Sequence, residues 1–381
     1  MKVAALCSGG VDSSVSLGLL EERDVDVTAF YLRIWLEQDL HFLGDCPWQE
    51  DLSYIRELCK LTGVKLEVVN LQQDYHERVV QHAIDEVRAG RTPNPDIWCN
   101  TRIKFGLFAD ILDSGQYGDY DRIASGHYAQ IAQVEGDDGN TRPCLKMAPD
   151  PVKDQTYFLS HLKSNQLSRL MFPIGEYNKS QVRDIAQEMA LPNAARKDSQ
   201  GICFLGQFKY RDFIRHYCGT RKGSFIEHET GKRVGEHEGF WFYTNGQRKG
   251  LGIGGSASGN GKPWYVVDKN PDDNVVFVSQ HYHDGKHKRR HFETSNTNWF
   301  LGEDTKLLSE QSLAGRIMVK LRHGPEMQPC NLYPIEKTAH SSATGNPNVR
   351  VVLQRNDQGI ASGQYAAFYR DNLCLGSGVI Q

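Results

Sequence analysis

A short loop near the start of the chain constrains the fold more than any other feature. It reads SGGVDSS over residues 8–14, after an apolar run at 3–7 and before a helical pattern. Small residues let the backbone approach an anion closely, and the first turn of a helix offers unpaired N–H groups and partial positive charge. The pattern predicts a phosphate-binding turn without the GK[ST] ending of a Walker loop. The alternative is an ordinary turn with an Asp or Ser N-cap.

Residues 1–205 alternate between strand-like and helix-like stretches. Stretches rich in β-branched and apolar residues cover 3–7, 25–35, 65–71 and 121–131. Amphipathic stretches cover 13–22, 50–62, 74–88, 101–113, 153–162 and 179–190. This alternation predicts βαβ units around a mostly parallel sheet, and the sequence GDDGNT at 136–141 is typical of a hairpin tip.

The pattern changes after residue 203. One helix is expected over 208–217, followed by short strands and glycine-rich turns. From residue 293 onwards the pattern is all β, with strands expected at 316–322, 350–354, 365–370 and 373–380. The sequence therefore predicts three domains, an α/β domain at 1–205, a small mixed domain at 206–285 and a barrel or sandwich at 286–381.

The charge divides along the same boundaries. The net charge of −3 combines −9 in residues 1–205, +6 in 206–292 and 0 in 293–381. The basic segment, which includes KHKRRH at 286–291, suits RNA phosphates, although a basic run can also be a solvated face. With 39% hydrophobic residues the chain has enough apolar surface for packed cores, and no run approaches the ~20 apolar residues of a membrane span.

Two of the nine cysteines lie in polar, loop-like motifs. In GRTPNPDIWCN (90–100), two prolines argue against a regular element, so we expect Cys99 near the N-terminus of the next helix, where its thiol pKa would be lowered. Asp96 can orient a substrate or transfer a proton. In KDSQGICF (197–204), Lys197 would stabilise a thiolate at Cys203. The alternatives are a surface turn with a buried Cys99 and a structural Cys203; no C-x-x-C pair favours a zinc site.

These motifs occur in the order SGGVDSS, TPNPDIWCN, KDQTYFL (153–159), KDSQGICF and GQRKGLGIGG (246–255). The loop at 8–14 resembles the pyrophosphate loop (PP-loop) of ATP pyrophosphatases, and the whole series resembles the tRNA-specific 2-thiouridylase family along the entire chain. The resemblance implies an α/β N-terminal domain with a parallel sheet and an adenine nucleotide alpha hydrolase-like PP-loop fold, a small mixed central domain and a C-terminal β-barrel. It also implies that ATP, with Mg²⁺, adenylates the C2 oxygen of the wobble uridine in tRNA anticodons before sulfur replaces it, with release of AMP and pyrophosphate.

The resemblance assigns roles to matching positions. Cys203 would carry sulfur as a persulfide, Cys99 would be the second catalytic cysteine, and Asp96 would be a general acid/base. A transient Cys99–Cys203 disulfide would follow sulfur delivery, unless Cys99 first releases hydrosulfide. The ATP site would comprise Leu6, Cys7, Ser8, Gly9, Gly10, Val11, Asp12, Ser13, Leu32 and Gly126. The target base would meet Asn94, Pro95 and Asp96. The tRNA contacts would be His127, Lys153, Asp154, Gln155, Arg322, His323 and Gln364.

Two of these positions depart from the family pattern. Leu32 stands where methionine is usual, and His323 stands where an aromatic residue is usual. Residues 335–349 are longer than a minimal barrel loop requires and are interpreted as an insertion.

The expected partners are tRNA and a sulfur donor or relay protein of a cysteine desulfurase system. We expect a monomer with no membrane association. The cytoplasm is the expected location, and a plastid or mitochondrion is the alternative if a transit peptide has been removed.

Two other functions stay open at this stage. One is a PP-loop small-molecule synthetase that amidates or condenses a carboxylate; it explains the loop but neither cysteine motif. The other is a non-catalytic RNA-binding protein with a degenerate nucleotide fold; the intact loop at 8–14 argues against it.

Overall fold

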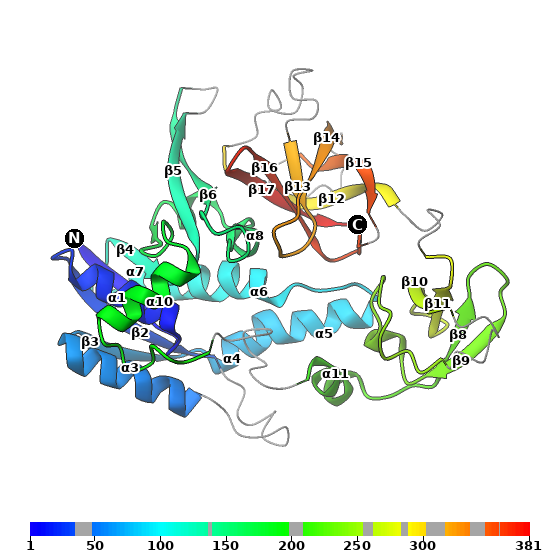
Figure 1. The fold of residues 1–381 in the computed structure, drawn as a ribbon, viewed down its shortest axis with the longest axis horizontal. Coiled ribbons are helices and arrows are strands. Elements are labelled where there is room, and N and C mark those ends of the chain that lie inside the picture. Colours follow the sequence, from blue (N-terminus) through cyan, green and yellow to red (C-terminus); the bar gives the residue numbers. More distant parts are fainter. Residues whose placement is uncertain are drawn as a thin grey trace.

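The computed structural model describes residues 1–34, 48–135, 139–197, 209–253, 262–282, 289–301, 317–335, 347–357 and 359–381. Its strands form sheets of five, four and eight strands, and helices flank the five-stranded sheet (Figure 1). The predicted order of an α/β part, a small mixed part and a β-barrel is confirmed.

The first sheet is parallel and has the strand order β3-β2-β1-β4-β7. Its strands are β1 (Lys2–Leu6), β2 (Asp26–Arg33), β3 (Lys65–Asn70), β4 (Arg122–Ser125) and β7 (Leu170–Met171). Alternate residues of β1 enter different cores, since Val3 and Ala5 pack in one apolar cluster and Ala4 packs in another. Burial on both faces explains why this strand is apolar without alternation in the sequence.

Helices cover both faces of this sheet. The Val3 face packs against α1 (Val11–Glu21), α3 (Trp48–Thr62) and α10 (Lys179–Glu188). The Ala4 face packs against α4 (Gln72–Tyr75), η2 (His76–Val80), α5 (Gln81–Arg88), α6 (Pro95–Trp98), η3 (Cys99–Leu107) and α7 (Phe108–Asp113). None of the described helices is both long enough and apolar enough to cross a bilayer.

Three predicted elements have different bounds in the structure. The stretch at 121–131 is not one strand, because it divides into β4 and β5 (Ala129–Glu135), which belong to different sheets. The helix expected at 153–162 is shorter, α8 (Thr156–Leu159), because Asp150 Oδ1 accepts hydrogen bonds from the backbone N–H groups of Val152 and Lys153 and forms a turn. The predicted hairpin is confirmed, since β5 pairs antiparallel with β6 (Thr141–Met147); residues 136–138 of its tip lie outside the described residues.

The second sheet contains four strands in the order β10-β11-β8-β9. They are β8 (Gly223–Glu227), β9 (Arg233–His237), β10 (Tyr265–Asn270) and β11 (Val275–Ser279), with α11 (Tyr210–Cys218) before them and η4 (Phe240–Phe242) between β9 and β10. Phe225, Tyr243 and Trp264 are buried in the core of this small part.

The third sheet closes into a barrel. Its strands are β12 (Arg289–Trp299), β13 (Ile317–Lys320), β14 (Gln328–Pro334), β15 (Val349–Asp357), β16 (Tyr365–Arg370) and β17 (Leu373–Ile380). They follow the order β12-β15-β14-β13-β16-β17, and β12 also pairs with β17. In addition β17 pairs with β6, so the hairpin of the N-terminal part extends the barrel sheet (Figure 1). This pairing joins the first and last parts of the chain in one sheet.

Candidate active site

The predicted phosphate-binding turn lies between β1 and α1. Gly10 is the N-cap of α1, and within the described residues no side chain caps this helix. The Ser13 hydroxyl instead bonds to the backbone of the loop. Ser13 Oγ accepts a hydrogen bond from the Ser8 N–H at 3.1 Å and donates one to the Gly10 carbonyl at 3.0 Å. The N-terminus of α1, with its partial positive charge, is therefore available to an anion.

Two glycines bring the backbone close to this turn. A Cβ on Gly9, whose φ is +78°, would lie 2.7 Å from Asp51 Cα. A Cβ on Gly126, which follows β4, would lie 2.7 Å from the backbone nitrogen of Ser13. Any side chain at either position would displace the loop.

Two side chains converge on Asp12 at the same place. Lys179 Nζ, at the start of α10, lies 2.7 Å from Asp12 Oδ1, and the Tyr128 hydroxyl donates to the same oxygen at 2.8 Å. Lys179 is 15% exposed and Asp12 is 31% exposed, so the pair is only partly shielded from water. The negative charge of the loop carboxylate is thus compensated by the ammonium group of Lys179.

Two further residues hold the Gly9 carbonyl of the loop. Asn193 Nδ2 donates to the Gly9 carbonyl at 2.8 Å and to Ser14 Oγ at 2.9 Å. Arg196 donates to the same Gly9 carbonyl at 2.9 Å and pairs with Asp51 at 2.6 Å. The sequence did not predict these four contacts, because none of the residues lies in a motif and each contacts the loop from at least 116 positions away. The residues are Tyr128, Lys179, Asn193 and Arg196.

The other predicted ATP-site residues lie at the carboxyl ends of their strands. Leu6 ends β1, and Leu32 lies near the end of β2, where it pairs with Val69. Cys7 is buried, and burial, together with the neighbouring Cys59, raises the pKa of its thiol well above the ordinary value. Cys7 is therefore a packing residue of the loop and not a reactive thiol.

The Cys99 motif forms the start of a helix, although its two prolines argued against a regular element. Asn94 is the N-cap and accepts a hydrogen bond from the Ile97 N–H at 3.3 Å, and Pro95 occupies the first helical position, where its missing N–H costs nothing. The helix then continues through η3 and α7 to Asp113, so the helix expected at 101–113 begins six residues earlier. Cys99 is consequently its fifth residue, 1% exposed, rather than a residue of its first turn.

The helix that carries Cys99 lies against the segment that carries Gly126. The rings of Phe105 and His127 are 5.8 Å apart, and His127 Nδ1 lies 2.9 Å from Ser125 Oγ. Burial, together with the nearby Lys104, lowers the pKa of His127 well below its ordinary value. The lowered pKa favours the neutral imidazole of His127, which lies between the phosphate-binding turn and the Cys99 helix.

The second predicted thiol, Cys203, lies outside the described residues, as does the rest of its loop after Lys197. The pairing of Cys99 with Cys203 thus stays a prediction. Within the described part of the chain none of the seven cysteines forms a disulfide.

The predicted tRNA contacts of the KDQ segment have unequal exposure. Lys153 is partly exposed, and Gln155 is tied to Tyr128, whose N–H donates to its side chain at 2.9 Å. Asp154 is buried, with its carboxylate 3.1 Å from Lys320 Nζ of β13 and within hydrogen-bond distance of Ala148 N and Thr156 Oγ1. Its side chain joins the segment to the barrel.

The predicted contacts from the barrel lie at the same junction. Arg322 is 56% exposed and pairs with Asp357 at 3.0 Å. The His323 ring lies 4.7 Å from that of Phe158, the second-to-last residue of the KDQTYFL motif. Gln364 donates from Nε2 to the carbonyls of Thr92 and Pro93. The structure therefore brings His323 to the KDQTYFL motif and Gln364 to the Cys99 motif, while Arg322 pairs with a residue of the barrel itself.

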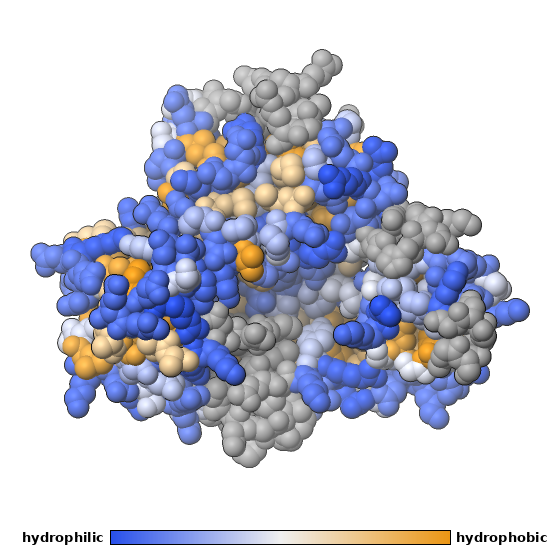
Figure 2. All heavy atoms as spheres, in the orientation of Figure 1, coloured by the Kyte–Doolittle hydropathy of each residue, from blue (hydrophilic) through white to orange (hydrophobic). Residues whose placement is uncertain are grey.

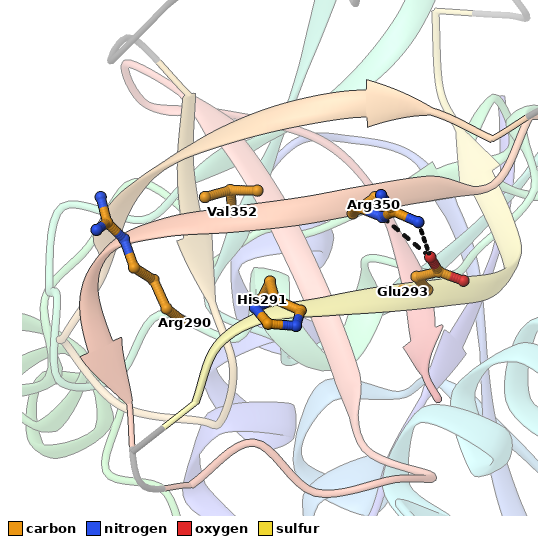
Figure 3. A pocket seen from close by; sticks show the side chains of 5 residues that line it. All are labelled: Arg290, His291, Glu293, Arg350 and Val352. Carbon is orange, nitrogen blue, oxygen red and sulfur yellow. Dashed lines mark hydrogen bonds and ion pairs between the residues drawn. The ribbon is translucent and has the colours of Figure 1, made fainter. Parts of the chain in front are cut away.

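The surface around these parts is largely hydrophilic. Figure 2 shows a hollow between the barrel, at the top, and the second sheet, at the right. A separate pocket lies on the outside of the barrel, where Arg290, His291 and Glu293 of β12 face Arg350 and Val352 of β15 (Figure 3). Arg350 pairs with Glu293 at 2.8 Å, and no predicted site residue lines this described pocket.

Family models match the chain in three consecutive parts. Residues 1–207 match the family described as tRNA methyl transferase HUP domain, 211–280 the tRNA methyl transferase PRC-barrel domain and 289–380 the aminomethyltransferase beta-barrel domain.

Curated relatives match the chain over its full length. The tRNA-specific 2-thiouridylase MnmA of Parabacteroides distasonis is 42% identical, covering 100% of this chain and 99% of that protein. The MnmA of Porphyromonas gingivalis is 43% identical with the same coverage. Among solved structures, an NMN synthetase from Francisella tularensis matches with a TM-score of 0.32 and 14% identity, over 58% of this chain and 77% of that one. The chain belongs to the tRNA-specific 2-thiouridylase family.

Proposed function

We propose that this protein catalyses the ATP-dependent 2-thiolation of the wobble uridine in tRNA anticodons. The observation that carries the proposal is the identity of 42–43% to tRNA-specific 2-thiouridylases along the entire chain. A small-molecule synthetase would need the PP-loop but not the Cys99 helix or a barrel in contact with it.

ATP fits the phosphate-binding turn. The N-terminus of α1, the hydroxyls of Ser8 and Ser13 and the close approach of Gly9 and Gly126 suit its phosphates, and Lys179 supplies a positive charge beside them. Leu6 and Leu32, at the carboxyl ends of β1 and β2, suit the adenine end, because ligands of open α/β sheets bind at that edge.

Mg²⁺ accompanies ATP in this proposal. The described residues contain no group of three or more His, Cys, Asp or Glu side chains able to hold a metal. Asp12, the carboxylate of the loop, would help to hold the ion beside the ATP phosphates, and the ion would neutralise part of their charge.

The sulfur chemistry uses two thiols. Adenylation forms a bond between the uracil C2 oxygen and the α-phosphorus and releases pyrophosphate. The terminal sulfur of a Cys203 persulfide attacks C2, and AMP leaves with the oxygen. The Cys99 thiolate then attacks Sγ of Cys203, which breaks the S–S bond to the delivered sulfur and leaves 2-thiouridine and a Cys99–Cys203 disulfide.

A second order of these steps ends in the same way. Cys99 first attacks the persulfide and releases hydrosulfide, which then displaces AMP from C2. In both cases two electrons from a cellular reductant must restore the thiols after each turnover, in agreement with a reducing compartment such as the cytoplasm. Asp96, in the first turn of the helix, exchanges protons with the base, and Asn94 and Pro95 contact it.

The three domains have different roles in this reaction. Residues 1–205 adenylate and thiolate, while 206–285 and 286–381 hold the tRNA together with Lys153 and its neighbours. A sulfur relay protein loads Cys203, and the enzyme acts as a monomer.

The test is a reaction with ATP, a persulfide donor and unmodified tRNA, followed by nucleoside mass spectrometry. The proposal predicts 2-thiouridine at the wobble position together with AMP. AMP formation that does not require tRNA would favour a small-molecule synthetase, and tRNA binding without ATP turnover would favour a non-catalytic RNA-binding protein.

A further inference from the structure

The barrel contacts the Cys99 motif through a short segment that ends at the first residue of β16. The backbone N–H of Thr92 donates to the Ser362 carbonyl at 2.8 Å, and Gln364 Nε2 donates to the carbonyls of Thr92 and Pro93 at 3.0 and 3.1 Å. We name residues 361–365 the barrel strap. Three hydrogen bonds thus join the strap to the two residues that precede Asn94.

The strap is itself held on the barrel. Gly363 N–H donates to the Ile380 carbonyl at 2.9 Å, and Ile380 N–H donates to the Gln364 carbonyl at 2.8 Å. Gly363 has a φ of +88°, and a Cβ there would lie 3.0 Å from Thr92 O. Glycine at position 363 therefore suits both the positive φ and the close approach of the strap to the loop that carries Thr92.

Tyr365 extends this contact to the residue beside Cys99. The Trp98 indole N–H donates to the Tyr365 hydroxyl at 2.8 Å in the buried interior. The Trp98 ring is also flanked by His82, at 4.2 Å between centroids, and by the Arg102 guanidinium at 5.1 Å. The hydrogen bond from the Trp98 indole N–H to Tyr365 fixes the Trp98 ring against the barrel. Cys99 is the next residue of the helix.

Tyr365 also contacts the KDQTYFL motif, because the Tyr157 hydroxyl donates to the Tyr365 carbonyl at 3.2 Å. The strap thus holds the segment from Asn94 to Cys99 on both sides. Gln364 bonds the two residues before Asn94, and Tyr365 bonds Trp98, the residue before Cys99.

We infer that the barrel strap is a positioning element of the active site and that Tyr365 is its principal positioning residue. This inference rests on the proposed function, and it gives the C-terminal barrel a role in the sulfur-transfer step in addition to tRNA binding. Tyr365 is 3% exposed and cannot contact tRNA directly, which separates positioning from binding. A substitution of Gln364 would not distinguish positioning from tRNA binding, because Gln364 is also a predicted tRNA contact.

The test is Tyr365→Phe, which removes only the hydroxyl. Because small displacements of reacting groups are costly, kcat for 2-thiolation should fall roughly tenfold or more, while KM for tRNA and Kd for ATP should change less than about twofold. Tyr369→Phe is the matched control. It lies on the same strand, is fully buried, and its hydroxyl contacts Thr156 Oγ1 at 3.1 Å instead of the loop, so it should keep the wild-type kcat.

A second readout does not depend on thiolation. The rate of alkylation of Cys99 by iodoacetamide, followed on its tryptic peptide by mass spectrometry, should rise in Tyr365→Phe and not in Tyr369→Phe. Unchanged kcat and an unchanged Cys99 alkylation rate in Tyr365→Phe would overturn the inference, as would a loss confined to KM for tRNA. If the wild type forms no 2-thiouridine, the proposed function fails, and the alkylation rates still decide the inference.

Discussion

Replacing Lys320 with methionine tests how the barrel is joined to the KDQ segment. Lys320 and Asp154 both have 0% side-chain exposure, and their charged atoms are 3.1 Å apart. Methionine keeps most of the volume of lysine, but among the described residues it leaves the Asp154 carboxylate with the Ala148 N–H and the Thr156 hydroxyl as its remaining partners. Removal of one member of a buried ion pair costs about 3–5 kcal/mol, because the remaining charge stays buried.

The assay is urea unfolding followed by circular dichroism. With an m-value of about 2–3 kcal/mol/M, the midpoint should fall by about 1–2 M. The same variant should weaken tRNA binding, because Lys153 and Gln155 flank Asp154.

Two controls complete this experiment. Arg350→Gln breaks the pair with Glu293 on the outside of the barrel (Figure 3), where the side chains are 60% and 46% exposed, so it should cost less than about 1 kcal/mol. The double variant Asp154→Leu/Lys320→Met removes both charges and should recover most of the stability. A Lys320→Met protein within about 1 kcal/mol of the wild type in unfolding free energy would show that the buried pair does not stabilise this junction.

Three further predictions concern ATP, sulfur and pH. Lys179→Met should weaken ATP binding about tenfold by calorimetry, because the positive charge beside Asp12 is lost. Lys179→Arg keeps the charge and should retain part of the affinity. Equal ATP affinities of the wild type and both variants would contradict a role of Lys179 in ATP binding. Cys203→Ser should abolish 2-thiolation from a persulfide donor, and full activity of this variant would remove Cys203 from the mechanism. Burial lowers the pKa of His161 to about 4, so the unfolded chain takes up a proton below pH ~6.5 that the folded chain does not. The stability present above pH 6.5 should therefore be lost towards pH 4. His161→Gln should reduce the change of the unfolding free energy with pH by up to about 1.4 kcal/mol per pH unit, measured by urea unfolding at pH 7 and pH 5. An unchanged pH dependence would argue against a lowered pKa of His161.

The features that the sequence predicted correctly depend on local patterns. The turn at 8–14 is specified by an apolar strand, small residues and a helix start within one short stretch, and the strands at 365–370 and 373–380 match β16 and β17. The start of the Cys99 helix was misplaced, because Pro95 can either end an element or occupy its first position, and the Asn94 cap decides in favour of the second.

The features that were missed depend on tertiary contacts. The stretch at 121–131 has the composition of one strand, and only its pairing with β1 and then with β6 divides it. The pairing of β6 with β17 and the contacts of Lys179 and Asn193 with the PP-loop join positions more than 160 residues apart. Nothing in a local pattern encodes such a partner. Cys203 was identified as a candidate from its motif, and its position lies outside the described residues.

Activation of the C2 oxygen of the target uridine by ATP can be tested directly. An anticodon stem-loop with ¹⁸O at C2 of the wobble uridine is incubated with the enzyme, ATP and a persulfide donor, and the released AMP is analysed by mass spectrometry. Adenylation of the C2 oxygen predicts one ¹⁸O atom in AMP for each 2-thiouridine formed. Thiolated RNA accompanied by unlabelled AMP would show that the C2 oxygen is not adenylated.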